Sequence, residues 1–216
     1  MKDPTRIPQL TAEIERLWSA LPNHCLGDLI GLIGYEHLGE EELPARLTEL
    51  RRQFPARVSE CEGPCVVRTD SHDIAIHGST AILREVGPRP GRPSIWELSE
   101  VGAAQVSWPL RLIDATGSAH TYGIVRSITP LNPEVPTKLD TADRGFRIFV
   151  AELSDGTRLL ISKKLFAYVQ QRRELDVKEW SWRKLEGLTR GQQLRMITTG
   201  GEVEELGTVD RVWVVG

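Results

Sequence analysis

Two cysteines and two histidines between positions 61 and 77 of this 216-residue chain have the spacing of metal ligands. They form the pattern C-x3-C-x6-H-x4-H, made by Cys61, Cys65, His72 and His77. The spacing within each pair lets both of its residues bind the same metal ion, so the four residues could together bind one tetrahedral zinc ion. Zinc prefers thiolate and imidazole ligands. The gap between the pairs is shorter than the roughly twelve residues of a typical zinc finger, and cysteines often serve as small apolar residues. We therefore expect free thiols and no cofactor, with zinc binding as the alternative.

A second candidate site is the segment 158–195, which is rich in basic and aromatic side chains although the chain has a formal net charge of −3. Cations neutralise phosphates and aromatic rings stack on bases, so this composition is typical of nucleic-acid binding. Against this, Trp180 and Trp182 are two residues apart, which places both on one strand face and favours burial. Nucleic-acid binding therefore stays an alternative function, with candidate contacts Lys163, Lys164, Arg172, Arg173, Trp180, Trp182, Arg183 and Lys184.

The composition is that of a folded globular protein. Hydrophobic residues make up 40% and charged residues 26% of the chain, which excludes a disordered or collagen-like protein. No stretch approaches the 18 apolar residues of a spanning helix, and the N-terminus lacks the apolar run of a signal peptide. Three cysteines do not make a disulfide scaffold. We expect a cytoplasmic protein that does not bind membranes.

Residues 1–56 predict a small three-helix module. Apolar residues recur at helical spacing in the stretches 10–21, 26–33 and 43–54. Glycines interrupt the second stretch, and each costs a helix roughly 1 kcal/mol relative to alanine, so this helix must depend on packing, with close approach of another helix. The acidic balance and the long connection at 34–39 do not fit a helix-turn-helix DNA reader. We therefore expect a small helical docking or assembly module. The stretch LPNHCLGDLIGLIGYEHLGEEELPARL resembles short helical modules of bacterial proteins, a likeness that implies no activity.

From residue 61 onward, short β-prone runs alternate with turn signals. Two examples of such turns are Ala115–Ser118 and Ser154–Thr157, the second with an Asp-Gly pair between apolar strands. Many short strands at this spacing predict a mostly antiparallel, barrel-like or folded-over sheet over residues 61–216. Proline-rich stretches at 87–93 and 131–143 are expected as exposed loops. The predicted fold class is α+β, a helical module followed by one β-rich domain.

Several stretches of the β-rich part match a known family. They read FRIFVAELSDGTRLLISKKLFAYV, WSWRKLEGLTRGQQLRMI and GTVDRVWVV in the second half, with SIWELSEVGAAQV and CEGPCVVRTDSH upstream. Together they resemble a Hint domain, the β-fold of hedgehog autoprocessing domains and inteins. The resemblance covers residues 61–216.

The resemblance implies autoprocessing chemistry, but Leu165 stands where that chemistry needs a histidine. In that family a cysteine or serine attacks the preceding peptide carbonyl, and the histidine of a Thr-x-x-His motif protonates the leaving nitrogen. Cys61 would be the nucleophile, but the motif reads SKKL at 162–165 and ends in Leu165, and the chain ends in WVVG rather than in the His-Asn of inteins. Leucine has no proton to transfer, and acid–base catalysis contributes about 10²–10⁴ in rate.

The sequence therefore predicts a non-catalytic protein-interaction or regulatory protein with a degraded Hint-like domain, and its partner is another protein. The first alternative is an autoprocessing enzyme with Cys61 as nucleophile. The second is a nucleic-acid-binding protein that uses the segment 158–195.

Overall fold

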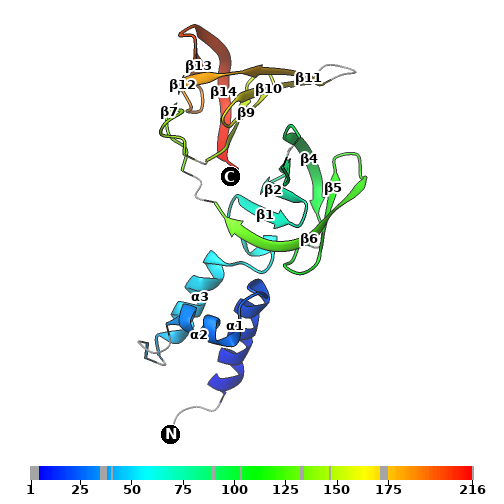
Figure 1. Cartoon of the computed structure of the whole chain (residues 1–216), viewed down its shortest axis with the longest axis vertical. Helices are drawn as coiled ribbons and strands as arrows, with labels where there is room; N and C mark the ends of the chain where they lie inside the picture. The colour runs from blue at the N-terminus through cyan, green and yellow to red at the C-terminus, as the bar shows by residue number, and fades with distance from the viewer. Residues whose placement is uncertain are drawn as a thin grey trace. The chain divides into compact units, whose positions relative to one another are not determined.

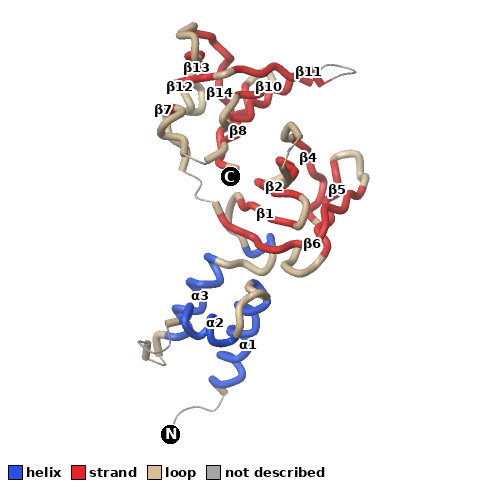
Figure 2. The backbone as a smooth tube through the Cα atoms, viewed as in Figure 1, coloured by secondary structure: helices blue, strands red, loops and turns tan. Residues whose placement is uncertain are grey.

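The computed structural model describes residues 5–34, 38–39, 41–88, 91–102, 104–131, 134–145, 147–170 and 175–215. Three helices come first, followed by a closed six-stranded antiparallel barrel and an eight-stranded antiparallel sheet (Figures 1 and 2). The predicted α+β, β-rich fold class is confirmed. The chain separates into two compact units, Met1–Pro130 and Leu131–Gly216. The stretch 61–216, which we expected to be one domain, is thus distributed over two sheets.

The three helices are α1 (Arg6–Ala20), α2 (Leu26–Ile33) and α3 (Leu43–Gln53), and they match the three apolar stretches. Their shared core includes the fully buried Leu17, Leu29 and Leu47. Helix α2 is stabilised by its ends: the Asp28 carboxylate accepts a hydrogen bond from the Cys25 amide at 3.0 Å, and Gly34 ends the helix in the left-handed conformation. These caps and the packing of Leu29 offset the weak helix propensity of its glycines.

The helices are joined to the barrel within the first unit by a short stretch of strand-like pairing. The Val58 amide donates to the Ala104 carbonyl at 3.1 Å, and the Val106 amide donates to the Ala56 carbonyl at 3.0 Å. A 3-10 helix, η2 (Val58–Glu60), follows and leads into the first strand.

The barrel of the first unit is a simple up-and-down closure. Each strand pairs with the next, and the last pairs with the first. The strand β4 pairs with β3 through its first half and with β5 through its second half, which bends the sheet around the core. The strands are β1 (Cys65–Thr69), β2 (His72–His77), β3 (Thr80–Glu85), β4 (Ser94–Val101), β5 (Pro109–Asp114) and β6 (Ala119–Pro130).

The second unit holds an eight-stranded sheet of the order β11-β10-β9-β8-β14-β13-β12-β7. The stretch 131–143, expected as a loop, contains the short strand β7, whose Asp140 pairs with Lys184. The strands are β7 (Lys138–Asp140), β8 (Phe149–Leu153), β9 (Arg158–Ile161), β10 (Leu165–Gln170), β11 (Leu175–Trp180), β12 (Trp182–Glu186), β13 (Gln193–Thr198) and β14 (Val203–Val214).

The two units repeat one strand plan at a spacing of 84 residues. In the first, Cys65 pairs with Pro130 and Thr69 with Val125; in the second, residues 84 positions later, Phe149 and Leu153, pair with Val214 and Val209. Both pairings also shift register after corresponding residues, 68 and 152. The strand corresponding to β4 is divided at Ser181 into β11 and β12.

Hydrogen bonds and sequence identity agree with this correspondence. The Ser107 amide donates to the Val125 carbonyl at 2.8 Å, and 84 residues later the Gly191 amide donates to the Val209 carbonyl at 2.7 Å. Across 110–125 and 194–209, six of the sixteen residues are identical. The shared residues are Leu110/Leu194, Arg111/Arg195, Ile113/Ile197, Gly117/Gly201, Gly123/Gly207 and Val125/Val209.

We predict that Gly123→Ala destabilises the barrel by about 2 kcal/mol. Gly123 has a φ of 81°, which costs an L-residue roughly 1–2 kcal/mol. The new Cβ would also overlap Asp70 Oδ1, which accepts a hydrogen bond from the Ile124 amide at 3.1 Å worth about 1 kcal/mol. The measurement is urea unfolding of the variant and the wild-type protein.

The matched control is Gly117→Ala, which has a similar φ of 86° with open space around the new Cβ. Its free energy of unfolding should fall by only about 1 kcal/mol, the cost of the positive φ alone. Equal losses in the two variants would contradict the role assigned to the Asp70 contact.

Candidate functional site

The structure brings Cys61 and Cys65 together at the start of the barrel. Cys61 ends η2, where its amide donates to the Val58 carbonyl at 3.0 Å, and Cys65 is the first residue of β1. Cys65 is 1% exposed and belongs to the barrel core, and Cys61 is partly exposed and packs against the same core. The two thiols thus belong to one cluster, and each shifts the pKa of the other.

The interaction between the two thiols separates their ionisation. The neighbouring Cys65 thiol stabilises the Cys61 thiolate and lowers the pKa of Cys61. The pKa of Cys65 is raised, first because its thiol proton is held by Cys61 and second because the group is buried. Cys61 is therefore the sulfur that can act as a nucleophile, and Cys65 is a buried proton donor beside it.

The two histidines of the predicted zinc site do not join the cysteines. His72 lies at the far end of β2 from Ile76, the partner of Cys65, and its Nδ1 is 2.8 Å from Ser71 Oγ. His77 follows the inward-facing Ile76, so strand alternation directs it to the other face. Among the described residues, no group of three or more His, Cys, Asp or Glu side chains could hold a metal ion. The predicted four-ligand zinc site is not formed, because β2 is extended and separates its two histidines.

Leu165, which the resemblance to Hint domains would place at the position of the family's histidine, is a core residue of the second unit. It is fully buried at the start of β10 and packs with residues such as Phe149 and Trp182. A side chain in this place stabilises the sheet and has no group that could protonate a leaving nitrogen.

The tryptophans of the predicted nucleic-acid site are part of the same core. Trp182 is 1% exposed, and its indole N–H donates to the Ser162 carbonyl at 3.0 Å. Trp180 is partly buried and packs against this core. The burial expected from their alternation is thus complete for Trp182 and partial for Trp180.

The cations of that segment are only partly available for a phosphate. Lys164 forms an ion pair with Glu179, and Lys184 lies 2.8 Å from Glu186 Oε1. The pKa of Lys184 is raised by this hydrogen-bonded carboxylate. Of the other candidates, Lys163 and Arg183 are exposed, and Arg172 and Arg173 lie outside the described residues.

A cluster of aromatic and imidazole rings in the barrel was not predicted from the sequence. Trp96 of β4 contacts His120 of β6 edge-to-face with ring centroids 4.4 Å apart. Tyr122 of β6 contacts His72 of β2 in the same way at 5.2 Å. His120 Nε2 is 2.9 Å from Asp114 Oδ2. The two-residue spacing of His120 and Tyr122, which places both on one strand face, was the sequence signal for this cluster.

Hydrogen bonds set the charge of the cluster. The Thr116 hydroxyl and the His120 ring both stabilise the Asp114 carboxylate, and the pKa of Asp114 is strongly lowered. Burial, with a smaller contribution from the Asp114 charge, raises the pKa of Tyr122 to about 12. The cluster thus carries a permanent carboxylate that orients an imidazole, with a neutral phenol beside it.

The fold itself does not require this cluster, as the second unit shows. The positions 84 residues after Asp114, His120 and Tyr122 are Thr198, Glu204 and Leu206. Of the four ring positions in β2, β4 and β6, only Trp96 recurs, as Trp180. The polar cluster is therefore an addition to the first barrel.

Helix α2 has an exposed apolar face. Leu29 and Ile33 are buried in the helical core, whereas Leu26 and Ile30 are 48% and 43% exposed. On the same side, a Cβ added at Gly31 would meet no atom within 4 Å. The close helix approach that we expected from the glycines is therefore not made at Gly31 by the described part of this chain.

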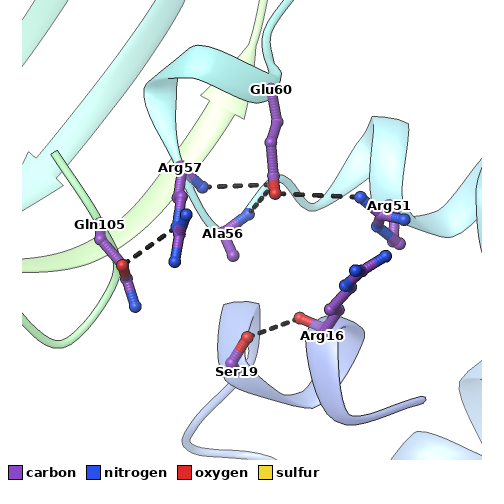
Figure 3. Close-up of a pocket in the computed structure, with 7 residues that line it drawn as sticks. All are labelled: Arg16, Ser19, Arg51, Ala56, Arg57, Glu60 and Gln105. Atoms are coloured by element: carbon purple, nitrogen blue, oxygen red, sulfur yellow. Dashed lines mark hydrogen bonds and ion pairs between the residues drawn. The ribbon is translucent and has the colours of Figure 1, made fainter. Parts of the chain in front are cut away.

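A polar cavity of about 420 Å³ lies where α1 and α3 meet the start of the barrel (Figure 3). Its arginines are largely satisfied by internal partners: Arg51 pairs with Glu13 at 2.7 Å, and Arg57 Nε donates to Gln105 Oε1 at 3.1 Å. The first interaction joins α3 to α1, and the second joins the segment after α3 to Gln105 of the barrel. The lining residues are Arg16, Ser19, Arg51, Ala56, Arg57, Glu60 and Gln105.

Comparisons with protein-family models, with curated proteins and with solved structures found no match for this chain. In the described part of the chain, no helix combines the length and the apolar character needed to span a bilayer.

We predict that Asp114 stabilises the barrel in a pH-dependent manner. Its pKa is lowered in the folded state relative to about 3.9 in an unfolded chain. The stabilisation is therefore complete above the unfolded value and is lost as the pH falls toward the folded value. Asp114→Asn should lower the unfolding temperature at pH 7 and make little difference at pH 2, as measured by thermal unfolding across this range.

The control is Asp155→Asn, in a turn of the second sheet, where the carboxylate accepts a hydrogen bond from the Thr157 amide at 2.9 Å. It should change the pH dependence less than Asp114→Asn does. A gap between Asp114→Asn and the wild-type protein that stays constant from pH 7 to pH 2 would contradict the prediction.

Proposed function

We propose that this chain is a non-catalytic protein-interaction protein whose Hint-like β domain has lost its catalytic acid, and that α2 docks on an apolar helix of a partner protein. The observation that carries the proposal is that α2 exposes the apolar side chains Leu26 and Ile30 beside the side that it buries in the helical core. Exposed apolar side chains that lie together mark surfaces at which proteins bind partners.

The exposed side chains of α2 are large enough to support binding. Full burial of a leucine or isoleucine side chain contributes roughly 1.5–3 kcal/mol, and Leu26 and Ile30 are each nearly half exposed. Trp18 extends this apolar surface toward the turn before α2, where its indole N–H donates to the His24 carbonyl at 2.8 Å. The indole is thus held in place before a partner arrives.

The glycines of α2 favour a helix as the partner element. Gly27 follows Leu26, and Gly31 follows Ile30 one helical turn later, so neither position carries a side chain that would hold a second helix away. A ridge of side chains on a second helix can approach closely at such positions. Within the chain, Gly31 only weakens α2, by about 1 kcal/mol relative to alanine; at a docking surface the same residue permits close approach.

The absence of catalysis rests on Leu165. This residue is fully buried in the core of the second unit and has no labile proton. It cannot protonate the leaving nitrogen as the histidine of the Hint family does.

The docking proposal is tested by opposing effects of one substitution on stability and on binding. Gly31→Leu should raise the stability of the helical module by roughly 0.8–1 kcal/mol, because it removes a helix-interior glycine without an internal clash, yet it should abolish partner binding. Ile30→Glu should abolish binding as well. The measurements are urea unfolding and affinity capture from host extract, followed by titration of the captured protein's helical segment as a peptide.

Val203→Glu is the matched control, because Val203 is 61% exposed in the second unit, and it should bind like the wild-type protein. Capture of the same proteins by all four forms would contradict the proposal. Sedimentation equilibrium of the purified chain tests whether the exposed face of α2 binds a second copy of the chain instead. A dimer that Ile30→Glu dissociates would show such self-association and would overturn the assignment to a different protein.

Autoprocessing is the second candidate, favoured by the partly exposed Cys61 with its lowered thiol pKa. If the non-catalytic assignment is right, the purified 24.2 kDa chain should keep its intact mass after prolonged incubation with dithiothreitol or hydroxylamine. Cleavage between Glu60 and Cys61 that Cys61→Ala prevents would instead establish autoprocessing.

A further inference from the structure

Cys61 and Cys65 are arranged as an exposed and a buried member of one thiol pair. Cys61 is partly exposed at the end of η2, and Cys65 is 1% exposed inside the barrel. Cys61 packs against the barrel core to which Cys65 belongs, and each thiol shifts the pKa of the other. A dissolved reagent therefore reaches the Cys61 sulfur first, and Cys65 lies in the same cluster, four residues further along the chain.

The packing of the fold does not demand a sulfur at either position. The residue 84 positions after Cys65 is Phe149, which is fully buried in the second unit, and the residue corresponding to Cys61 is Gly145. All three cysteines of the chain lie in the first unit, and the third, Cys25, caps α2 away from this pair. The thiol pair is thus a feature of one copy of the repeated plan.

The connection between the two cysteines can accommodate a covalent bond. Only Glu62, Gly63 and Pro64 separate them, and the space around a Cβ at Gly63 is open. The two sulfurs of this cluster must approach to about 2.05 Å for a disulfide. The short loop, rather than the strand ladder of β1, can make this adjustment.

We propose that Cys61 and Cys65 form a reversible oxidation site that reacts with hydroperoxides, with Cys61 as the attacking thiol and Cys65 as the resolving thiol. The Cys61 thiolate attacks one peroxide oxygen; an S–O bond forms, the O–O bond breaks, and the released hydroxide or alkoxide takes up a proton. The product is a sulfenic acid at Cys61.

The second step consumes the Cys65 thiol. Its sulfur attacks the sulfenic sulfur, an S–S bond forms and the S–O bond breaks, and the leaving hydroxide departs as water with the proton from Cys65. In total, two thiols lose two electrons and the peroxide is reduced to water, or to water and an alcohol. A small dithiol returns both cysteines to the reduced state by thiol–disulfide exchange.

The test uses the full-length chain with Cys25→Ser, because serine is a preferred N-cap residue and should preserve the end of α2. The protein is reduced, treated with a chelator to exclude protection by metal, and exposed to one equivalent of hydrogen peroxide. We expect both remaining thiols to disappear from a thiol titration, with a loss of two hydrogens in the intact mass and no intermolecular dimer. Dithiothreitol should restore both thiols.

Single substitutions separate the two roles. In Cys65→Ser, oxidation should stop at a sulfenic acid on Cys61 that dimedone traps; in Cys61→Ser, the buried Cys65 should give neither a dimedone adduct nor a disulfide. Cys65→Ala repeats the first variant without a hydroxyl in the core, and thermal unfolding confirms that each protein is folded. Two free thiols after peroxide treatment, or a disulfide between two chains, would overturn the proposal.

Discussion

The antiparallel pairing of β1 with β6 is the interaction on which the arrangement of the first unit depends. It runs from Cys65 opposite Pro130 to Thr69 opposite Val125 and closes the six strands into a barrel. Closure removes the sheet edges and encloses the side chains that point inward, Cys65 among them. It also brings β2 beside the end of β6 through β1, so that His72 and Tyr122 come into ring contact. Without this ladder, neither the thiol pair nor the ring cluster would be held in place.

The repetition of the strand plan distinguishes what the fold needs from what it tolerates. Both copies keep glycine at 123 and 207, where φ is positive and a neighbouring side chain is close, and both keep valine at 125 and 209 in the closing ladder. Where the copies differ, the fold accepts different chemistry, as with Cys65 and Phe149. Functional features are therefore best sought among the positions at which the copies differ. The thiol pair and the ring cluster are two such features, and both lie in the first unit.

Local patterns were sufficient for the elements they encode. The helices followed from apolar spacing, because a helix places its own neighbours three and four residues apart. The turns predicted at Ala115–Ser118 and Ser154–Thr157 lie where the sequence places them, between β5 and β6 and between β8 and β9. The 84-residue repeat was present in the sequence, but it becomes visible only when distant segments are compared.

The sequence by itself determined the helical module, the antiparallel β-rich class and the absence of a histidine at Leu165, since these depend on residue type and local spacing. Only the tertiary structure decided which chemical groups meet. It joined Cys61 to Cys65, separated both from His72, and buried Trp182 in a core rather than on a basic surface. The physical reason is that strand alternation and barrel closure set side-chain contacts across residues far apart in the chain, and spacing along the sequence carries little of that information.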